Sequence, residues 1–181
     1  MTTPQDWAPY SSLAEAARVY LRDPDMALEH LRGVVDSQAV TSFIMSRGET
    51  TEPWGDALWQ EVVLTDGPRL IMWRATDERD STRDEQRQTL SAAVRTIALS
   101  SFTDQILTTE YEVLQDGTRR LSEVHLKLFT QLVNRSRQYS ATETTLYCES
   151  FRYSKTVDNG GLAQMERLIQ FGRTLSRYLG V

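Results

Sequence analysis

The side chains best suited to chemistry are few in this sequence: two histidines, His30 and His125, and one cysteine, Cys148. His125 follows Glu123 by two residues in a segment of alternating apolar and polar residues, so both belong to the polar face of a predicted strand. A zinc site needs three or four ligands with recognisable spacing, and the sequence offers no third ligand beside this pair. We therefore expect a solvated strand surface and no metal site.

The remaining candidates for catalysis are also weak. Cys148 is expected in the middle of a strand, where a small core residue is common, so we do not interpret it as a nucleophile. Glu110 and Glu112 share a face that is expected to meet solvent, which leaves no desolvated acid for proton transfer. A site assembled around His125 or Glu110 is the least favoured alternative. We expect no enzymatic activity and no cofactor.

Charge is distributed unevenly along the 181 residues. The net charge is −5, but residues 119–181 carry ten bases and five acids. The acidic whole argues against nucleic-acid binding and against constitutive membrane binding. Most of these bases are expected to be solvated surface. The densest basic cluster surrounds a predicted hairpin and loop and is the candidate surface for an anionic ligand or a partner; it comprises Arg119, Arg120, Lys127, Arg135 and Arg137.

The pattern of apolar residues predicts a mainly β chain. An unanchored tail at 1–10 and two short helices within 12–36 are expected to form a helical lead-in, separate from a domain at 37–181. Asp66-Gly67 and Asp116-Gly117 predict hairpin turns, residues 48–56 are turn-like, and 77–88 contain no apolar residue and predict an exposed loop. Seven strands are expected, at 39–47, 57–65, 69–76, 90–99, 102–114, 119–130 and 142–155.

Two of these strands show a clear inward face, and the last element shows a clear apolar stripe. The inward residues are expected to be Leu107, Thr109, Tyr111 and Val113 in one strand and Val124, Leu126 and Leu128 in the next. A helix begins after Asp158-Asn159-Gly160-Gly161, a segment interpreted as a cap because it lacks the spacing of a phosphate loop. Its stripe is expected to contain Leu162, Met165, Ile169, Gly172, Leu175 and Leu179.

Seven strands followed by one amphipathic helix resemble the pleckstrin-homology-like fold of the bacterial type. This resemblance rests on the order of elements over residues 39–179. It implies a seven-stranded antiparallel, partly open barrel capped by the C-terminal helix, in the α+β, mainly β class. The basic lipid-binding pattern of that family does not carry over, because the first Asp-Gly hairpin has only Arg69 and Arg74 as bases. The family's usual tryptophan in the terminal helix is also missing.

The helical lead-in also resembles the START-like fold, in which the last helix covers a pocket. That alternative implies a carrier of a small apolar molecule or lipid, with a pocket lined by residues that include Trp73, Tyr111, Phe151 and Met165. The leading hypothesis is a non-catalytic binding module that contacts a protein partner or a second copy of itself as a homodimer. Without a signal sequence or a long apolar run, the expected location is the cytoplasm.

Overall fold

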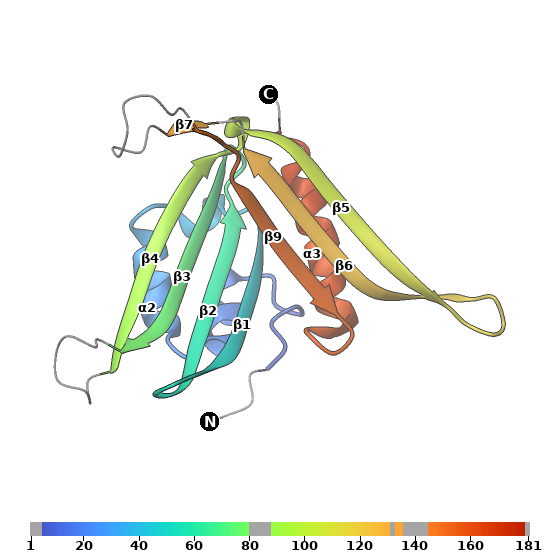
Figure 1. The fold of residues 1–181 in the computed structure, drawn as a ribbon, viewed down its shortest axis with the longest axis horizontal. Coiled ribbons are helices and arrows are strands. Elements are labelled where there is room, and N and C mark those ends of the chain that lie inside the picture. Colours follow the sequence, from blue (N-terminus) through green and yellow to red (C-terminus); the bar gives the residue numbers. More distant parts are fainter. Residues whose placement is uncertain (1–4, 80–87, 131–132, 136–144, 180–181) are drawn as a thin grey trace. The chain divides into compact units, whose positions relative to one another are not determined.

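A computed structural model describes residues 5–79, 88–130, 133–135 and 145–179 of the chain (Figure 1). Contacts between backbone segments divide the chain into two units, Met1–Ile97 and Ala98–Val181. The first unit combines the helical lead-in with the first four strands. The domain boundary predicted at residues 36 and 37 stays a prediction, and the two units are described separately below.

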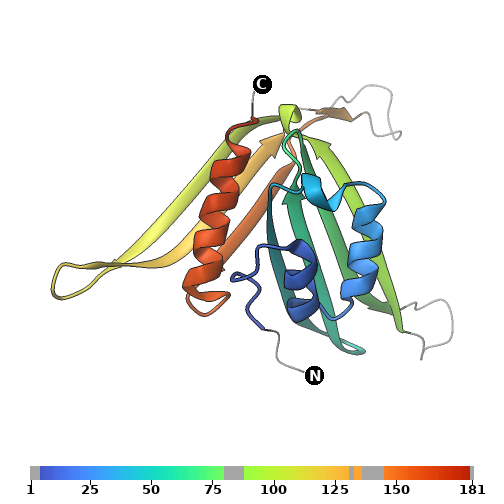
Figure 2. The same ribbon diagram turned by 180° about the vertical axis from the view of Figure 1, so that it is seen from behind.

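The first unit is a four-stranded sheet with two short helices on one face (Figure 2). Helix α1 (Leu13–Tyr20) and helix α2 (Pro24–Arg32) pack on each other, and α2 contacts β3. Proline at the first position of α2 suits a helix start, because the missing N–H would have no partner there. The strands lie in the order β1 (Ser42–Glu52), β2 (Gly55–Thr65), β3 (Arg69–Arg79) and β4 (Gln88–Ala98).

Two sequence predictions in this unit are wrong. The segment at 48–56 is largely strand, because β1 continues to Glu52, which pairs with Gly55 across a tight turn. The described part of the predicted tail is anchored, since Trp7 is fully buried and its ring lies 5.8 Å from Phe43 and 6.5 Å from Tyr20. A large aromatic side chain buries enough apolar surface to hold a short irregular segment in place.

The second unit is a three-stranded antiparallel sheet covered on one face by a helix (Figure 2). Its strands are β5 (Phe102–Val113), β6 (Arg119–Thr130) and β9 (Ser150–Thr156), in the order β5-β6-β9. Helix α3 (Gly161–Leu175) contacts β6 and β9. Two short strands, β7 (Val133–Arg135) and β8 (Thr145–Tyr147), form a separate pair. Three-residue 3₁₀ turns at Ser37–Ala39 and Leu99–Ser101 precede β1 and β5.

The fold class is therefore α+β and mainly β, as predicted, with seven main strands and a C-terminal helix. In the described part of the chain these strands form two separate sheets, not one closed barrel. The last predicted strand is interrupted at Cys148, which is exposed between β8 and β9 and not in the core. The exposed loop predicted at 77–88 lies partly outside the described residues, and its first three residues belong to β3.

Helix α3 packs tightly on its sheet at a glycine. A β-carbon at Gly172 would lie 3.3 Å from the Cδ1 atoms of both Leu107 and Leu126, and the Gln105 side chain donates a hydrogen bond of 2.9 Å to the Gly172 carbonyl. The predicted stripe is rotated, because Leu162 is 55% exposed and Ile169 is half-buried. The side chains that face the sheet are Gln164, Met165, Leu168, Phe171 and Leu175.

Candidate functional site: the β5–β6 hairpin

The β5–β6 hairpin continues beyond the third strand of its sheet (Figure 1). Strand β9 pairs with β6 only from Glu123 to Phe129, whereas β5 accompanies β6 as far as Arg119. Residues 111–121 therefore form a two-stranded ribbon, which we call the ribbon below. A two-stranded ribbon in water is marginally stable, because only one interstrand interface supports it.

Apolar side chains on the ribbon are exposed. Tyr111 is 51% exposed, Val113 67% and Leu114 37%. At the base of the ribbon, the exposed Val157 donates its backbone N–H to the Ser122 carbonyl at 3.3 Å. The ribbon thus places several apolar side chains in solvent next to one another along the chain, which is a property of interaction surfaces.

The turn of the ribbon is held by local polar contacts. Asp116 accepts hydrogen bonds from the backbone N–H of Thr118 at 2.9 Å and from its hydroxyl at 2.6 Å. The hydroxyl bond contributes most to lowering the pKa of Asp116 below its ordinary value. Glu112 forms an ion pair with Arg120 across the strands. These contacts keep the hairpin turn formed on a ribbon that has no third strand.

A bulge stands where the ribbon leaves the sheet. The register changes between Glu110, which pairs with Glu123, and Tyr111, which pairs with Leu121, so Ser122 is left over. One extra residue moves every later side chain to the other face of the sheet. Next to the turn, Val113 pairs with Arg119. If this register continued without a bulge, Glu110 would lie opposite Ser122, on the face away from Glu123 and His125. The bulge brings it to their face.

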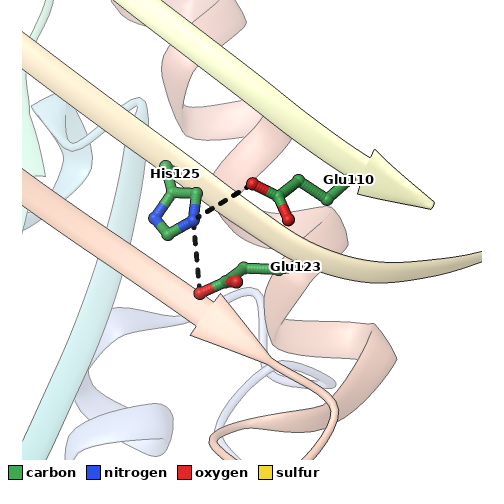
Figure 3. Close-up of side chains that lie close together, drawn as sticks. All are labelled: Glu110, Glu123 and His125. Atoms are coloured by element: carbon green, nitrogen blue, oxygen red, sulfur yellow. Dashed lines mark ion pairs between the residues drawn. The ribbon is translucent and has the colours of Figure 1, made fainter. Parts of the chain in front are cut away.

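The bulge therefore creates a cluster of Glu110, Glu123 and His125 (Figure 3). His125 Nε2 lies 3.2 Å from Glu123 Oε1 and 3.9 Å from Glu110 Oε1, and the three potential ligand atoms all lie within 4.8 Å of one another. Glu123 and His125 are half-buried, and Glu110 is 57% exposed. Glu110 is the third potential ligand that sequence reasoning did not place beside Glu123 and His125.

The turn predicted at Asp116-Gly117 carries a signal for the position of Glu110. A two-residue turn there would pair Gln115 with Thr118, and the same register places Leu107 opposite Leu126 and Glu110 opposite Glu123. The structure closes the hairpin differently, since Leu114 donates its backbone N–H to the Thr118 carbonyl. The bulge at Ser122 compensates for this shift and restores the pairing of Glu110 with Glu123.

The structure does not gather the predicted basic cluster at one place. Arg119 and Arg120 lie at the exposed end of β6, whereas Lys127 follows seven residues later, roughly 23 Å along the strand at about 3.3 Å per residue. Arg120 is already paired with Glu112. Arg135 lies in β7, and Arg137 lies outside the described residues.

The residues expected to line a pocket have different surroundings. Trp73 is fully buried in the first unit, where its indole N–H donates to His30 Nδ1 at 3.2 Å. Met165 is buried on the inner face of α3, and the ring of Phe151 lies 5.7 Å from that of Phe102 in the second unit. Tyr111 continues the alternation of Leu107 and Thr109 along β5, but it lies on the ribbon, beyond the stretch of β6 that β9 pairs with, and it is exposed.

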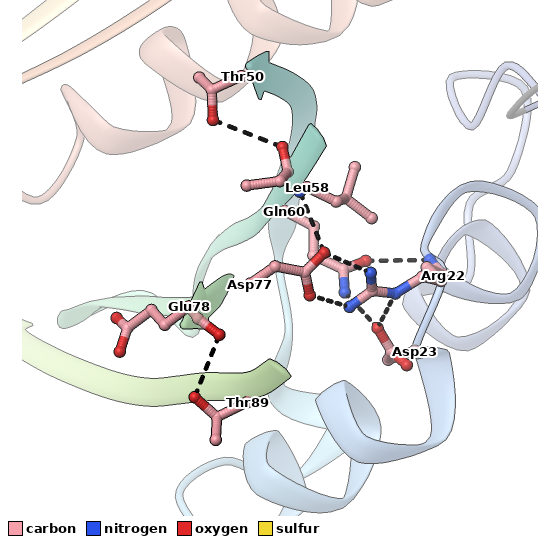
Figure 4. A network of polar contacts seen from close by, with 9 residues as sticks. Arg22, Asp23, Thr50, Leu58, Gln60, Asp77, Glu78 and Thr89 are labelled. Atoms are coloured by element: carbon pink, nitrogen blue, oxygen red, sulfur yellow. Dashed lines mark hydrogen bonds and ion pairs between the residues drawn. The ribbon is translucent and has the colours of Figure 1, made fainter. Parts of the chain in front are cut away.

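A second polar network, in the first unit, joins the segment between α1 and α2 to β2 and β3 (Figure 4). The Arg22 guanidinium donates to both carboxylate oxygens of Asp77 at 2.7 Å and to Asp23 at 2.7 Å. The buried Gln60 accepts from the Arg22 backbone N–H and donates to Asp23. Every named group in this network has a partner, so we interpret it as structural.

No family model, no curated protein and no solved structure matches the chain. The functional inference below therefore rests on the structure. In the described part of the chain, none of the helices has the length and apolar character needed to cross a membrane.

Proposed function

We propose that this protein is a non-catalytic binding module of the pleckstrin-homology-like type, and that it binds a protein partner through the β5–β6 ribbon. The observation that carries the proposal is the exposure of Tyr111, Val113 and Leu114 on a ribbon without a third strand. Covering these side chains would remove apolar surface from water. It would also support an element that is marginally stable alone.

The partner that fits best is an extended segment added to the free edge of β5. In the described residues β5 has a hydrogen-bonded neighbour on one side only, which is β6. An exposed edge of this kind can accept another strand through its backbone groups, while alternate side chains provide specificity. We therefore propose β-strand addition as the mode of binding.

Charge distinguishes between candidate partner strands. Strand β5 carries Asp104, Glu110 and Glu112 and no lysine or arginine. A second copy of β5 would bring three further carboxylates to the same edge and no compensating base. A segment that alternates basic and apolar side chains would be complementary in both respects. We therefore propose a different protein, not a second copy of this chain, as the partner.

The carrier alternative receives less support from the second unit. A carrier would need space beneath α3, yet Gly172 lies in contact with Leu107 and Leu126. Met165, Leu168 and Phe171 are fully buried along the same helix face. Tight packing of this kind favours α3 as a support for the sheet, and the sheet in turn positions the ribbon.

A synthetic peptide tests the proposal. A peptide of about eight residues that alternates lysine and valine should bind the full chain, measured by fluorescence anisotropy. The Tyr111→Asp/Val113→Asp double variant should bind at least about tenfold more weakly, because it removes the apolar contacts and adds like charge to an acidic edge. Leu162→Asp is the matched control, since Leu162 is equally exposed but lies on α3, and it should bind as the wild type does.

Two outcomes would overturn this proposal. The first is equal binding of a charge-inverted peptide with glutamate in place of lysine, which would show that the acidic edge does not select the partner. The second is a stable dimer in light scattering that the ribbon variant dissociates, which would identify a second copy as the occupant.

A further inference from the structure

We propose that Glu110, Glu123 and His125 form a binding site for a divalent transition-metal ion of the zinc class. The inference goes beyond the proposed function, because it concerns the base of the ribbon and needs no protein partner. The donors are one imidazole nitrogen and two carboxylate oxygens. This combination suits zinc and its first-row neighbours better than magnesium or calcium, which prefer oxygen ligands alone.

The ligand atoms lie close to the separations that a tetrahedral ion requires, and all three are within 4.8 Å of one another. Zinc bonds of about 2.0–2.1 Å place neighbouring ligand atoms about 3.3 Å apart in a tetrahedron. The separation of 3.2 Å between His125 Nε2 and Glu123 Oε1 already agrees with this value. The separation of 3.9 Å to Glu110 Oε1 is about 0.6 Å longer than the tetrahedral value, so this side chain must move closer to bind the same ion. Glu110 is the most exposed of the three, so its side chain can rotate to do so.

The backbone fixes where the three ligands originate. Glu110 and Glu123 are direct cross-strand partners, and His125 is two residues beyond Glu123 on the same face of β6. Strand β9 pairs with both β6 positions, Glu123 with Thr156 and His125 with Ser154. Two ligands therefore lie on the central strand of the sheet, and ligands on paired strands are held more precisely than ligands on loops.

Electrostatics also favour a cation at this position. Like charges directly opposite on neighbouring strands repel each other, and Glu110 faces Glu123 in this way. Within the described residues, no arginine or lysine forms an ion pair with either carboxylate, since Arg120 pairs with Glu112 and Lys127 lies opposite Ile106 and Arg152. A divalent ion would neutralise both carboxylates and leave its fourth position open to water.

Isothermal titration calorimetry, in which ZnCl2 is added to the metal-free full chain, tests the site. We expect one ion per chain, with weaker binding of MgCl2. Affinity should fall in acid, because protons compete with zinc for its ligands. His125→Ala and Glu110→Gln should each weaken zinc binding at least about tenfold.

Two control variants separate this site from other zinc ligands. Glu112→Gln removes a carboxylate two residues from Glu110 that lies outside the cluster, and Cys148→Ser removes the exposed thiol. Both should bind zinc as the wild type does. The proposal is overturned if no stoichiometric zinc binding occurs, if Glu110→Gln binds as tightly as the wild type, or if Cys148→Ser abolishes binding. Glu110 is exposed, so its glutamine variant should fold even if His125→Ala does not. Failure here would leave peptide binding by the ribbon unaffected.

Discussion

Replacing Gly172 with leucine should strongly destabilise the second unit. Even a methyl group at this position would lie 3.3 Å from Leu107 and Leu126, which is closer than ordinary van der Waals contact. A leucine would have to displace α3 from its sheet and break the hydrogen bond from Gln105 to the Gly172 carbonyl. We expect a loss of about 3 kcal/mol in the free energy of unfolding, the upper part of the range for overpacking.

Urea denaturation followed by circular dichroism measures this loss, and Arg173→Leu is the control. Arg173 is the next residue of α3 and is exposed, so a leucine there meets solvent and should change stability by less than about 0.5 kcal/mol. Gly172→Ala should lie between the wild type and Gly172→Leu, because alanine favours the helix by about 1 kcal/mol but crowds the two leucines. Equal stability of Gly172→Leu and the wild type would contradict the tight packing of α3 on its sheet.

Replacing Asp77 with asparagine should destabilise the first unit by about 2 kcal/mol, because a charge-assisted pair of hydrogen bonds is lost. Asp77 accepts two hydrogen bonds from Arg22 and one from the backbone N–H of Leu58 at 3.1 Å. Glu78→Gln is the control, since Glu78 is the next residue along β3 and its side chain is exposed. It should unfold at nearly the same urea concentration as the wild type.

The effect of Asp77→Asn should also depend on pH. The hydrogen bonds from Arg22 lower the pKa of Asp77 below its ordinary value. A lowered pKa in the folded state stabilises the fold above the unfolded pKa of about 3.9, and this stabilisation is lost as the pH falls through the folded value. The stability difference between wild type and Asp77→Asn should therefore be constant near neutral pH and shrink below about pH 4. A difference that grows on acidification would contradict the role given to Asp77.

Most elements of the fold could be predicted because their sequence signals are local. The alternation around Val124 and Leu126 identifies β6, the Asp116-Gly117 turn identifies its hairpin, and the apolar stripe with Gly160-Gly161 before it identifies α3. The rotation of that stripe could not be read from spacing alone. Leu162 and Leu168 both fit a helical period, and the position of the sheet decides that Leu168 is buried and Leu162 exposed.

The candidate site depends on the register of the β5–β6 hairpin. A two-residue turn at Asp116-Gly117 would pair Glu110 with Glu123, so the turn and the alternation together could have predicted that these side chains meet. The structure reaches the same pairing differently, because Leu114 pairs with Thr118 and the bulge at Ser122 shifts the register back. The buried position of Trp7 could not be predicted, because its partners Tyr20 and Phe43 are distant in sequence.

Site-specific photocrosslinking most directly tests the central claim that the β5–β6 ribbon is the binding surface. A photoreactive phenylalanine analogue would replace Tyr111 in one full-length variant and Tyr178 in another, in cells that naturally produce the protein. Both side chains are exposed, but Tyr178 lies after α3 and away from the ribbon in sequence.

We predict that the variant with the photoreactive residue at position 111 forms one discrete crosslinked product with another protein. This product should be lost when Val113→Asp is added to the same chain. The variant with the photoreactive residue at position 178 should form no such product. Equal products from both positions, or a product from position 111 that survives Val113→Asp, would contradict binding through the ribbon. A product containing two copies of this chain would contradict the proposed basic partner.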